Sequence, residues 1–273
     1  MAPNGVFFVF RGRVCYNSPM KNFLKKNLAL VLVIFVILVA FVGLIIYKNK
    51  AVSAGDEEDP LAYSADLSGL DLASVLPASD LNGGIADHIK GDANAPLTIF
   101  EYADYQCTAC ASMNPYISQL LEEYKGKLKI VYRSTPLTSI HPNAIAAASA
   151  VEAAGLQGYW EEYGNLLFSN QAEWFYSKGT TRTNLFMSYF TSIAGDSGNL
   201  AKFRSDMSSE AVKKKVKFDN AISEFYNLNS TPSFIDEDGK EIEWVYKENQ
   251  TMTDTMNFFR EYIDNKLKEK GID

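Results

Sequence analysis

The strongest apolar pattern in this 273-residue chain is an uncharged run at residues 28–47, which consists mostly of Leu, Val, Ile and Phe. A helix of about 20 such residues crosses the hydrocarbon core of a bilayer, which is roughly 30 Å thick. Five basic side chains at positions 11–26 precede the run, and the acidic residues 56–59 follow it. This charge bias predicts a single transmembrane helix, with residues 1–27 in the cytoplasm and the rest of the chain outside.

A cleaved signal peptide is the alternative interpretation, because Val52-Ser53-Ala54 has the small residues of a cleavage site. The apolar run is longer than the roughly 7–15 residues of a signal peptide, and two lysines separate it from the candidate site, which favours a retained anchor. Met20 begins a segment typical of an anchored protein. We therefore hypothesise that residues 1–19 are an over-extended start and that Cys15 has no role.

Beyond the apolar run, the pattern separates a linker from a folded domain. Residues 48–86 are rich in Asp, Ser, Ala and Gly and show no long period, so we expect a linker there, with the domain occupying residues 87–273. Residues 96–102 have little polar relief on either face, which is typical of a central strand. A helix at about 107–124 and an alternating strand at 128–133 follow, and this order predicts parallel pairing of the two strands.

The second half of the domain changes character. Residues from about 138 to 228 carry helical patterns only, which predicts an all-helical insertion whose aromatic residues are core rather than a peptide groove. A β-hairpin is expected next, with strands at 230–235 and 241–246 around a polar turn. The Thr251-x-x-Asp254 cap then begins a C-terminal helix with one apolar face, which should cover the sheet.

Composition and charge restrict the function. The chain is 47% hydrophobic and 22% charged, so a packed core is expected. Its net charge of −7 is uneven, because residues 1–50 hold seven of the 26 basic side chains and no acid. Residues 51–273 therefore carry 19 basic and 33 acidic side chains, a net charge of −14. An acidic body of this kind argues against nucleic acid as a partner.

The cysteines point to redox chemistry. There are three, Cys15, Cys107 and Cys110, whereas a disulfide scaffold normally shows more, at wider spacings. At a helix N-terminus, unpaired backbone N–H groups and the helix dipole favour the Cys107 thiolate, which is both a nucleophile and a good leaving group. Cys110 lies one turn further on the same face, where it is suited to resolve a mixed disulfide.

Three other interpretations of the Cys-x-x-Cys pair stay open. A structural disulfide around a loop of about four residues would contribute only roughly 2 kcal/mol. A zinc site has enough candidate ligands if His88 and His141 join the cysteines, but it lacks the second short-spaced pair of a zinc finger. The motif is also short enough to arise by chance, although the predicted strand before it and helix after it are the context that it requires.

Glu101 is the other unusual residue near the cysteines. Alternation along the strand places it on the same face as Leu97 and Ile99, so a carboxylate lies on an apolar face close to the thiols. Either it takes part in their chemistry, or it sits at the strand end and reaches water.

Several motifs in order resemble the DsbA-like thiol-disulfide oxidoreductases of the thioredoxin superfamily. The likeness covers roughly residues 85–270 and begins with Asp87-His88-x-x-Gly91, followed by residues 95–110 around the cysteines. It continues in the segments Arg133-Ser134-Thr135-Pro136-Leu137, His141-Pro142-Asn143-Ala144, Gln157-Gly158-Tyr159-Trp160 and Thr231-Pro232-Ser233-Phe234.

The resemblance implies an α/β thioredoxin-like fold with an inserted all-helical domain, preceded here by the predicted transmembrane helix. It implies that Pro232 is a cis proline facing the cysteines, and that Thr231, with Thr108 and Ala109, contacts bound substrate. Glu101 matches the buried acid that helps to move the proton of the resolving thiol. The dipeptide Thr108-Ala109 departs from the Pro-His of many strongly oxidising members, which leaves the oxidising strength of the protein open.

Three functions follow as hypotheses. The first is an extracytoplasmic, membrane-tethered oxidase that passes the Cys107–Cys110 disulfide to reduced secreted or membrane proteins and is reoxidised by a membrane partner of the DsbB or VKOR type. The second is a reductase for a particular client such as apocytochrome c. The third is a peptide-binding or chaperone module without redox chemistry. None of the three calls for a metal or another cofactor.

Overall fold

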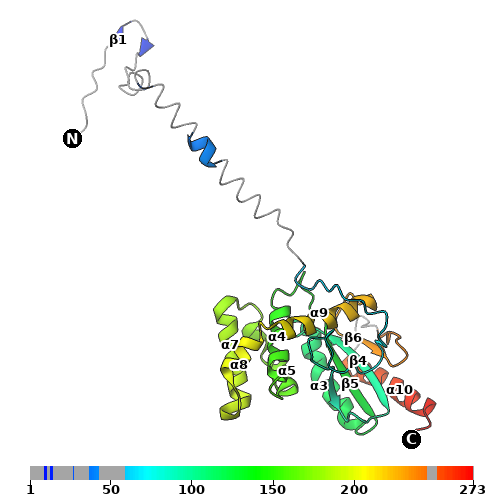
Figure 1. Ribbon diagram of the computed structural model, residues 1–273. Coiled ribbons are helices and arrows are strands. Elements are labelled where there is room, and N and C mark those ends of the chain that lie inside the picture. The colour runs from blue at the N-terminus through cyan, green and yellow to red at the C-terminus, as the bar shows by residue number, and fades with distance from the viewer. Residues whose placement is uncertain are drawn as a thin grey trace. The chain divides into compact units, whose positions relative to one another are not determined.

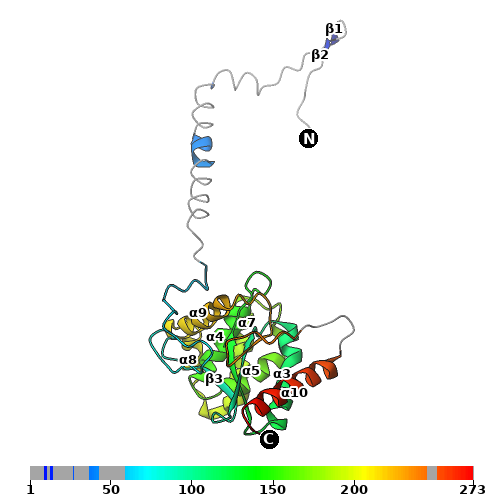
Figure 2. The same ribbon diagram turned by 90° about the vertical axis from the view of Figure 1, so that its right-hand side faces the viewer.

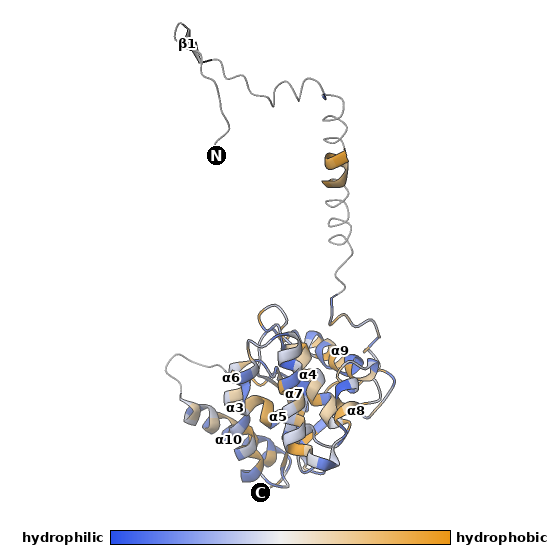
Figure 3. Cartoon of the chain, turned by 90° about the vertical axis from the view of Figure 1, so that its left-hand side faces the viewer, coloured by the Kyte–Doolittle hydropathy of each residue, from blue (hydrophilic) through white to orange (hydrophobic). Residues whose placement is uncertain are grey.

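The computed structural model describes residues 9–10, 13–14, 27, 37–42, 59–244 and 251–272. The chain divides into two compact units, Met1–Pro60 and Leu61–Asp273. In the first unit, β1 (Val9–Phe10) and β2 (Arg13–Val14) form an antiparallel pair. Most of the predicted transmembrane run lies outside the described residues. Its described part, residues 37–42, is helical and hydrophobic (Figure 3), and no described helix is both long and apolar enough to cross a bilayer.

A four-stranded mixed sheet forms the centre of the second unit, with the strand order β3-β5-β4-β6 (Figure 1). The predicted central strands are confirmed, because β4 and β5 pair in parallel along their whole length. The two outer strands run antiparallel to their neighbours. The strands are β3 (His88–Gly91), β4 (Leu97–Ala103), β5 (Leu128–Ser134) and β6 (Ser233–Asp236).

Each face of the sheet is covered by helices because alternate residues of β4 and β5 are apolar on both sides. On one face, Leu97 and Ile99 pack with α3 (Thr108–Glu123) and α10 (Met252–Glu269), which lie side by side in Figure 2. On the other face, Phe100 packs against α9 (Glu210–Phe225) and the segment before β3. The sheet therefore has the buried, doubly covered centre that its apolar pattern predicts.

Between β5 and β6 the described residues are helical, as the pattern predicts. Figure 1 shows α4 and α5 between the sheet and the pair α7 and α8. The aromatic side chains in this region are mostly core, because Trp160, Tyr163, Phe168 and Trp174 are buried, whereas Tyr176 is exposed. The helices are α4 (Ala144–Gly155), α5 (Trp160–Ser169), α6 (Gln171–Trp174), α7 (Gly179–Ala194), the 3-10 turn η1 (Gly195–Ser197), α8 (Leu200–Asp206) and α9.

The predicted β-hairpin after the insertion forms only at its turn end within the described residues, and residues 245–246 of its second strand lie outside them. β6 pairs with β4, and on its return side a bridge joins Ile235 and Glu241. The Asp236 N–H donates to the Lys240 carbonyl and the Ile242 N–H to the Phe234 carbonyl, both at 2.8 Å. The Trp244 backbone N–H bonds to the Ile242 carbonyl instead of continuing a ladder. The C-terminal helix is confirmed, and its capping box has both the Thr251 and the Asp254 hydrogen bonds in place.

Part of the predicted linker belongs to the folded domain. Leu72 and Leu76 are buried against the β4–β5 face of the sheet, and the Leu72 carbonyl accepts a hydrogen bond from Arg133 Nη1 at 2.6 Å. The error has a physical reason. Single apolar residues separated by turns show no helical or strand period in the sequence, but they can still pack against an uncovered face of a sheet. Residues 61–86 are therefore a strap on the domain.

Candidate active site

The two cysteines of the motif lie at the N-terminus of α3. Cys107 is the N-cap residue and has extended backbone dihedral angles, and its N–H is held by the Asp104 carbonyl at 3.0 Å. Both cysteines are free thiols. The side chain of Cys107 is 8% exposed and that of Cys110 is fully buried, whereas Thr108 and Ala109 between them are exposed. Substrate can thus reach Cys107 and the dipeptide, but not Cys110.

The residues just before β6 lie against Cys107, although they are 124 residues away in the sequence. The Thr231–Pro232 peptide bond is cis, as the resemblance implied. Cys107 Sγ lies 3.3 Å from the Thr231 carbonyl oxygen, to which the thiol donates only in its protonated form. A cleft of about 490 Å³ opens beside this contact. It is lined by Ala109, Ser230, Thr231, Pro232, Ser233, Glu241, Ile242, Glu243 and Trp244.

The two thiols have opposite acidities. The pKa of Cys107 is lowered to about 5, chiefly because the Cys110 thiol donates a hydrogen bond to it. Burial opposes this effect, while the Thr231 side chain and the backbone N–H groups of Cys110 and Ala109 add to it. Burial raises the pKa of Cys110 well above its ordinary value, and the hydrogen bond to Cys107 and the Cys107 charge raise it further. At neutral pH the reduced site therefore holds a Cys107 thiolate beside a Cys110 thiol.

Glu101 is buried, as the resemblance implied, and does not reach water. It is 0% exposed, and its nearest charged partner is Lys90 on β3, with 3.7 Å between Nζ and a carboxylate oxygen. Burial raises the pKa of Glu101, although Lys90 acts in the opposite direction. Lys90 in turn donates to Asn114 Oδ1 at 3.0 Å and lies over the Tyr132 ring. The site thus contains an acid that can hold a proton nearer neutral pH than an exposed glutamate.

A polar network fixes the loop that leads into Cys107. Asp104 accepts hydrogen bonds from the Gln106 and Leu137 N–H groups, at 2.7 and 2.9 Å, and pairs with His141. Gln171 donates to the Cys107 carbonyl at 3.1 Å. Asp104 follows strand β4, whereas His141 and Gln171 belong to the helical insertion. The insertion therefore helps to hold Cys107 in place.

A second network consists of buried ion pairs. Asp87 pairs with Arg133 at 2.7 Å and with Lys215 at 3.1 Å, and Lys215 also pairs with Asp219 at 2.7 Å. All four side chains are at most 1% exposed, and the two acids balance the two bases. Burial raises the pKa of Asp87, but Lys215 and Arg133 outweigh it and hold that pKa below its ordinary value. The cluster joins β5, α9 and the strap.

The two histidines that the sequence offered as zinc ligands are engaged elsewhere. His88 pairs with Glu152 at 2.8 Å and stacks on Trp160, and His141 pairs with Asp104 at 2.7 Å. Within the part of the chain that the structure describes, no group of three or more potential ligands is arranged to hold a metal ion. The structure therefore does not support the zinc interpretation of the motif.

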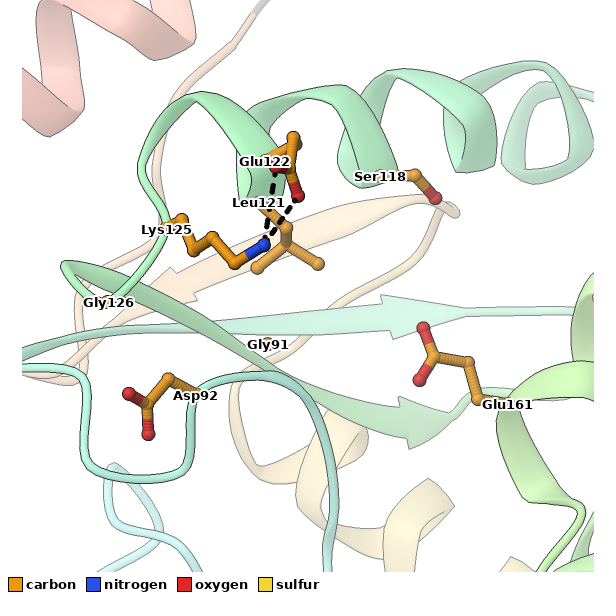
Figure 4. Close-up of a pocket in the computed structure, with 8 residues that line it drawn as sticks. All are labelled: Gly91, Asp92, Ser118, Leu121, Glu122, Lys125, Gly126 and Glu161. Atoms are coloured by element: carbon orange, nitrogen blue, oxygen red, sulfur yellow. Dashed lines mark hydrogen bonds and ion pairs between the residues drawn. The ribbon is translucent and has the colours of Figure 1, made fainter.

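Another groove, of about 500 Å³, lies at the far end of α3 (Figure 4). Asp92 and Glu161 border it, and Lys125 is paired with Glu122 within it. Because α3 has 16 residues, its two ends are about 24 Å apart. This groove is therefore separate from the cysteine site.

Comparison with known proteins identifies the family. A family model described as thioredoxin matches residues 84–258, which include both cysteines and the Thr231–Pro232 bond. The chain belongs to this thioredoxin family. Regions of two proteins named Na+/H+ antiporter NhaA match part of this thioredoxin-family chain, one from Salinispora tropica at 32% identity over 148 residues and one from Mycobacterium sp. (strain KMS) at 34% over 152. Each match covers 54% of this chain, which spans only about a fifth of those relatives, 21% and 23%.

Solved structures agree on the thioredoxin-like fold. Oxidised BdbD from Bacillus subtilis matches with a TM-score of 0.54 at 18% identity and covers 71% of this chain and 98% of its own. MdbA from Corynebacterium diphtheriae, a thiol-disulfide oxidoreductase, gives 0.51 at 20% identity, with 70% and 94% covered. Wolbachia pipientis alpha-DsbA1 gives 0.51 at 19% identity, with 72% and 100% covered. At these identities the likeness establishes the fold alone.

The thioredoxin domain places most of the predicted site residues around one contact. Cys107 contacts Thr231, Cys110 lies one turn further along α3, Ala109 and Pro232 line the cleft beside them, and Thr108 is exposed. Glu101 is buried nearby, without a hydrogen bond to either thiol. Sequence reasoning missed the partners behind them, which are Lys90, Asp104, Gln106, Gln171 and the Asp87 cluster. Two signals were available in the sequence. Lys90 and Arg133 are charged residues within strands, where a buried charge requires a partner.

Proposed function

We propose that this protein is a thiol-disulfide oxidoreductase that donates the Cys107–Cys110 disulfide to folding proteins. The observation that carries the proposal is the contrast between Cys107, which is 8% exposed and has a low pKa, and the fully buried Cys110, one helical turn away, which has a high pKa. Membership of the thioredoxin family supports it. The stabilised Cys107 thiolate favours the reduced form of the protein, which supports the direction of an oxidase over that of a reductase.

The exchange takes place in two balanced steps. A client thiolate attacks Cys107 Sγ, which breaks the bond to Cys110, forms a mixed disulfide and releases a Cys110 thiolate that takes up a proton. A second client thiolate attacks the client sulfur of the mixed disulfide and releases Cys107 as a thiolate. The client loses two electrons and the protein gains them. Within this proposal Glu101 exchanges the proton with Cys110, because its raised pKa allows it to carry one.

Replacement of single cysteines tests the function. Cys107→Ser is expected to reduce oxidative refolding of a reduced test protein to the rate without enzyme. Cys110→Ser cannot hold the disulfide and should lose this activity too, but its Cys107 thiolate should attack a disulfide-bonded client and stay trapped in a mixed disulfide that Cys110 would otherwise resolve. Cys15→Ser is the matched control and should keep the full rate. Refolding rates and gel analysis of trapped complexes measure both effects. Full activity of the Cys107→Ser protein would exclude the proposal and favour a binding module without redox chemistry.

The location and the electron acceptor are also part of the proposal. We infer an extracytoplasmic domain tethered by residues 28–47, because the apolar run and its flanking charges fit that orientation. Reduced secreted or membrane proteins are the proposed clients, and a membrane partner of the DsbB or VKOR type is the proposed reoxidant. A midpoint potential well below that of the glutathione couple would instead favour a client-specific reductase, for example for apocytochrome c.

The cleft beside Thr231 predicts a preference among clients. Two exposed carboxylates, Glu241 and Glu243, lie on its wall near the half-buried Trp244, and none of its lining residues is cationic. A peptide with Arg next to its cysteine is therefore expected to react about tenfold faster at low salt than the same peptide with Gln. The Glu241→Gln/Glu243→Gln protein should lose this difference, and Glu261→Gln on α10 should keep it. Stopped-flow exchange rates with the two peptides measure it.

A further inference from the structure

A groove between helices of the insertion has a charge opposite to that of the rest of the domain. It encloses about 540 Å³ among α4, α7, α8 and the start of α9, three of which Figure 1 shows together on one side of the sheet. Apolar side chains such as Ile145, Phe186 and Met207 line it, with Arg182, Arg204 and Lys213 and no carboxylate. Residues 51–273 carry a net charge of −14. A groove whose lining has three cationic residues and no acidic one therefore has the opposite sign of charge to the rest of this region.

The ion pairing of the arginines separates this groove from the rest of the domain. The structure describes the side chains of four arginines, Arg133, Arg182, Arg204 and Arg260. Arg133 pairs with Asp87, and Arg260 pairs with Glu123. Neither Arg182 nor Arg204 has a carboxylate partner among the described residues, and both line the same groove.

Arg182 is the more constrained of the two. It is half-buried, and its guanidinium bonds to a neutral group, because Nη1 donates to the Asn143 amide oxygen at 2.7 Å. Burial lowers the pKa of Arg182, which reflects the cost of holding a guanidinium away from water without a counter-ion. Lys213 does not share this deficit, because it is paired with Glu210 at 2.7 Å. Within the part of the chain that the structure describes, Arg182 therefore carries a half-buried charge without a carboxylate partner, and Arg204 adds an exposed, unpaired charge to the lining of the same groove.

We infer that this groove is a binding site for a small molecule with one carboxylate on an apolar body, held by Arg182 and Arg204. Ligand sites of about 300–1,000 Å³ are mostly apolar with a few polar groups that fix orientation, and this groove has that composition. The planar guanidinium fork matches the two oxygens of a carboxylate. The apolar body of the ligand lies on Ile145, Phe186 and Met207, and its head group supplies the missing counter-charge.

Binding of phenylpropionate to the full-length protein tests the site. Saturable binding of one molecule is expected by calorimetry, with ligand-observed NMR as a second measurement. Phenylpropionamide has the same apolar body without the charge and should bind at least about tenfold more weakly, because hydrogen bonds to a charged group contribute roughly 1.5–3 kcal/mol. Equal binding of the acid and the amide, or no saturation by the acid at millimolar concentration, overturns the inference.

Variants assign the binding to the two arginines. Arg182→Gln and Arg204→Glu should each weaken phenylpropionate binding about tenfold or more. Arg204 is exposed, so its replacement tests the site without disturbing the fold, and Lys214→Gln is the matched control because Lys214 is exposed on α9 and does not line the groove. Unchanged affinity in the Arg204→Glu protein contradicts the assignment. Phenyl phosphate binding more than tenfold tighter than phenylpropionate overturns the choice of a carboxylate head group.

Discussion

Replacing Asp87 by Asn is expected to lower the free energy of unfolding of the domain by about 3–5 kcal/mol. Asp87 is the shared partner of Arg133 and Lys215, and all three side chains are removed from water. An amide keeps the shape but not the charge, so a guanidinium and an ammonium stay buried with one carboxylate, Asp219, between them. Breaking a buried pair in this way costs more than the intact pair contributes, because a desolvated charge is left uncompensated.

Thermal or denaturant unfolding measures this effect. For a domain of this size the loss corresponds to a fall in melting temperature of roughly 10 °C. Asp80→Asn is the matched control, since Asp80 is exposed in the strap that precedes Asp87, and it should change stability by less than about 0.5 kcal/mol. Adding Lys215→Met to Asp87→Asn removes one unpaired charge and should recover part of the loss. A shift in the Asp87→Asn protein no larger than that of the control contradicts a stabilising role for the cluster.

The stability of the reduced domain is expected to rise with pH relative to that of the oxidised domain. The pKa of Cys107 is lowered from 9.0 to about 5 in the fold, so the unfolded thiol binds the proton more tightly than the folded one. The reduced fold therefore gains stability as pH rises above about 5, and the gain is complete near the unfolded value of about 9. At pH 7 the gain is about 3 kcal/mol, or about 60 mV more oxidising than a pair with an ordinary thiol.

The oxidised protein is the internal control, because its disulfide has no thiol to titrate. Denaturant unfolding of both forms between pH 5 and pH 8 gives the difference directly, and the ultraviolet absorbance of the thiolate gives the pKa itself. A difference between the two forms that stays constant over this range would contradict a stabilised thiolate. A low Cys107 pKa then does not require a histidine at Thr108 or Ala109, because the Cys110 thiol and the local N–H groups stabilise the thiolate.

Local pattern predicted the elements of the fold whose residues are close in sequence. Residues 96–102, with little polar relief on either face, marked a covered central strand, and Thr251 with Asp254 marked the start of the last helix. The described part of the return strand after β6 is shorter than predicted because the ladder stops at the hydrogen bond from the Ile242 N–H to the Phe234 carbonyl, and Trp244 packs on the Phe234 ring instead. The strap failed for the opposite reason, since its contacts are tertiary and leave no period in the sequence.

The residues of the site also divide into those that short motifs predicted and those that only the structure reveals. The cysteines, the cis proline and Glu101 belong to short motifs that can be read in order along the chain. Lys215 stands 128 residues from Asp87, and no local pattern connects a lysine on α9 to an acid before β3. Gln171 and the Cys107 carbonyl are 64 residues apart and meet only because the insertion folds back on α3. Contacts of this kind, which hold the site residues in place, form between elements that are distant in the sequence. They can be identified only from the structure.

The strap formed by residues 61–86 also fixes where the domain can be truncated. A recombinant protein that begins at residue 59 retains the Leu72 and Ser74 carbonyls, which accept from Arg133 at 2.6 and 2.9 Å. One that begins at residue 87, where the family motifs start, deprives a buried guanidinium of both acceptors and uncovers Phe100. Soluble expression is therefore expected from the longer version and aggregation from the shorter one, although both contain every residue of the redox site.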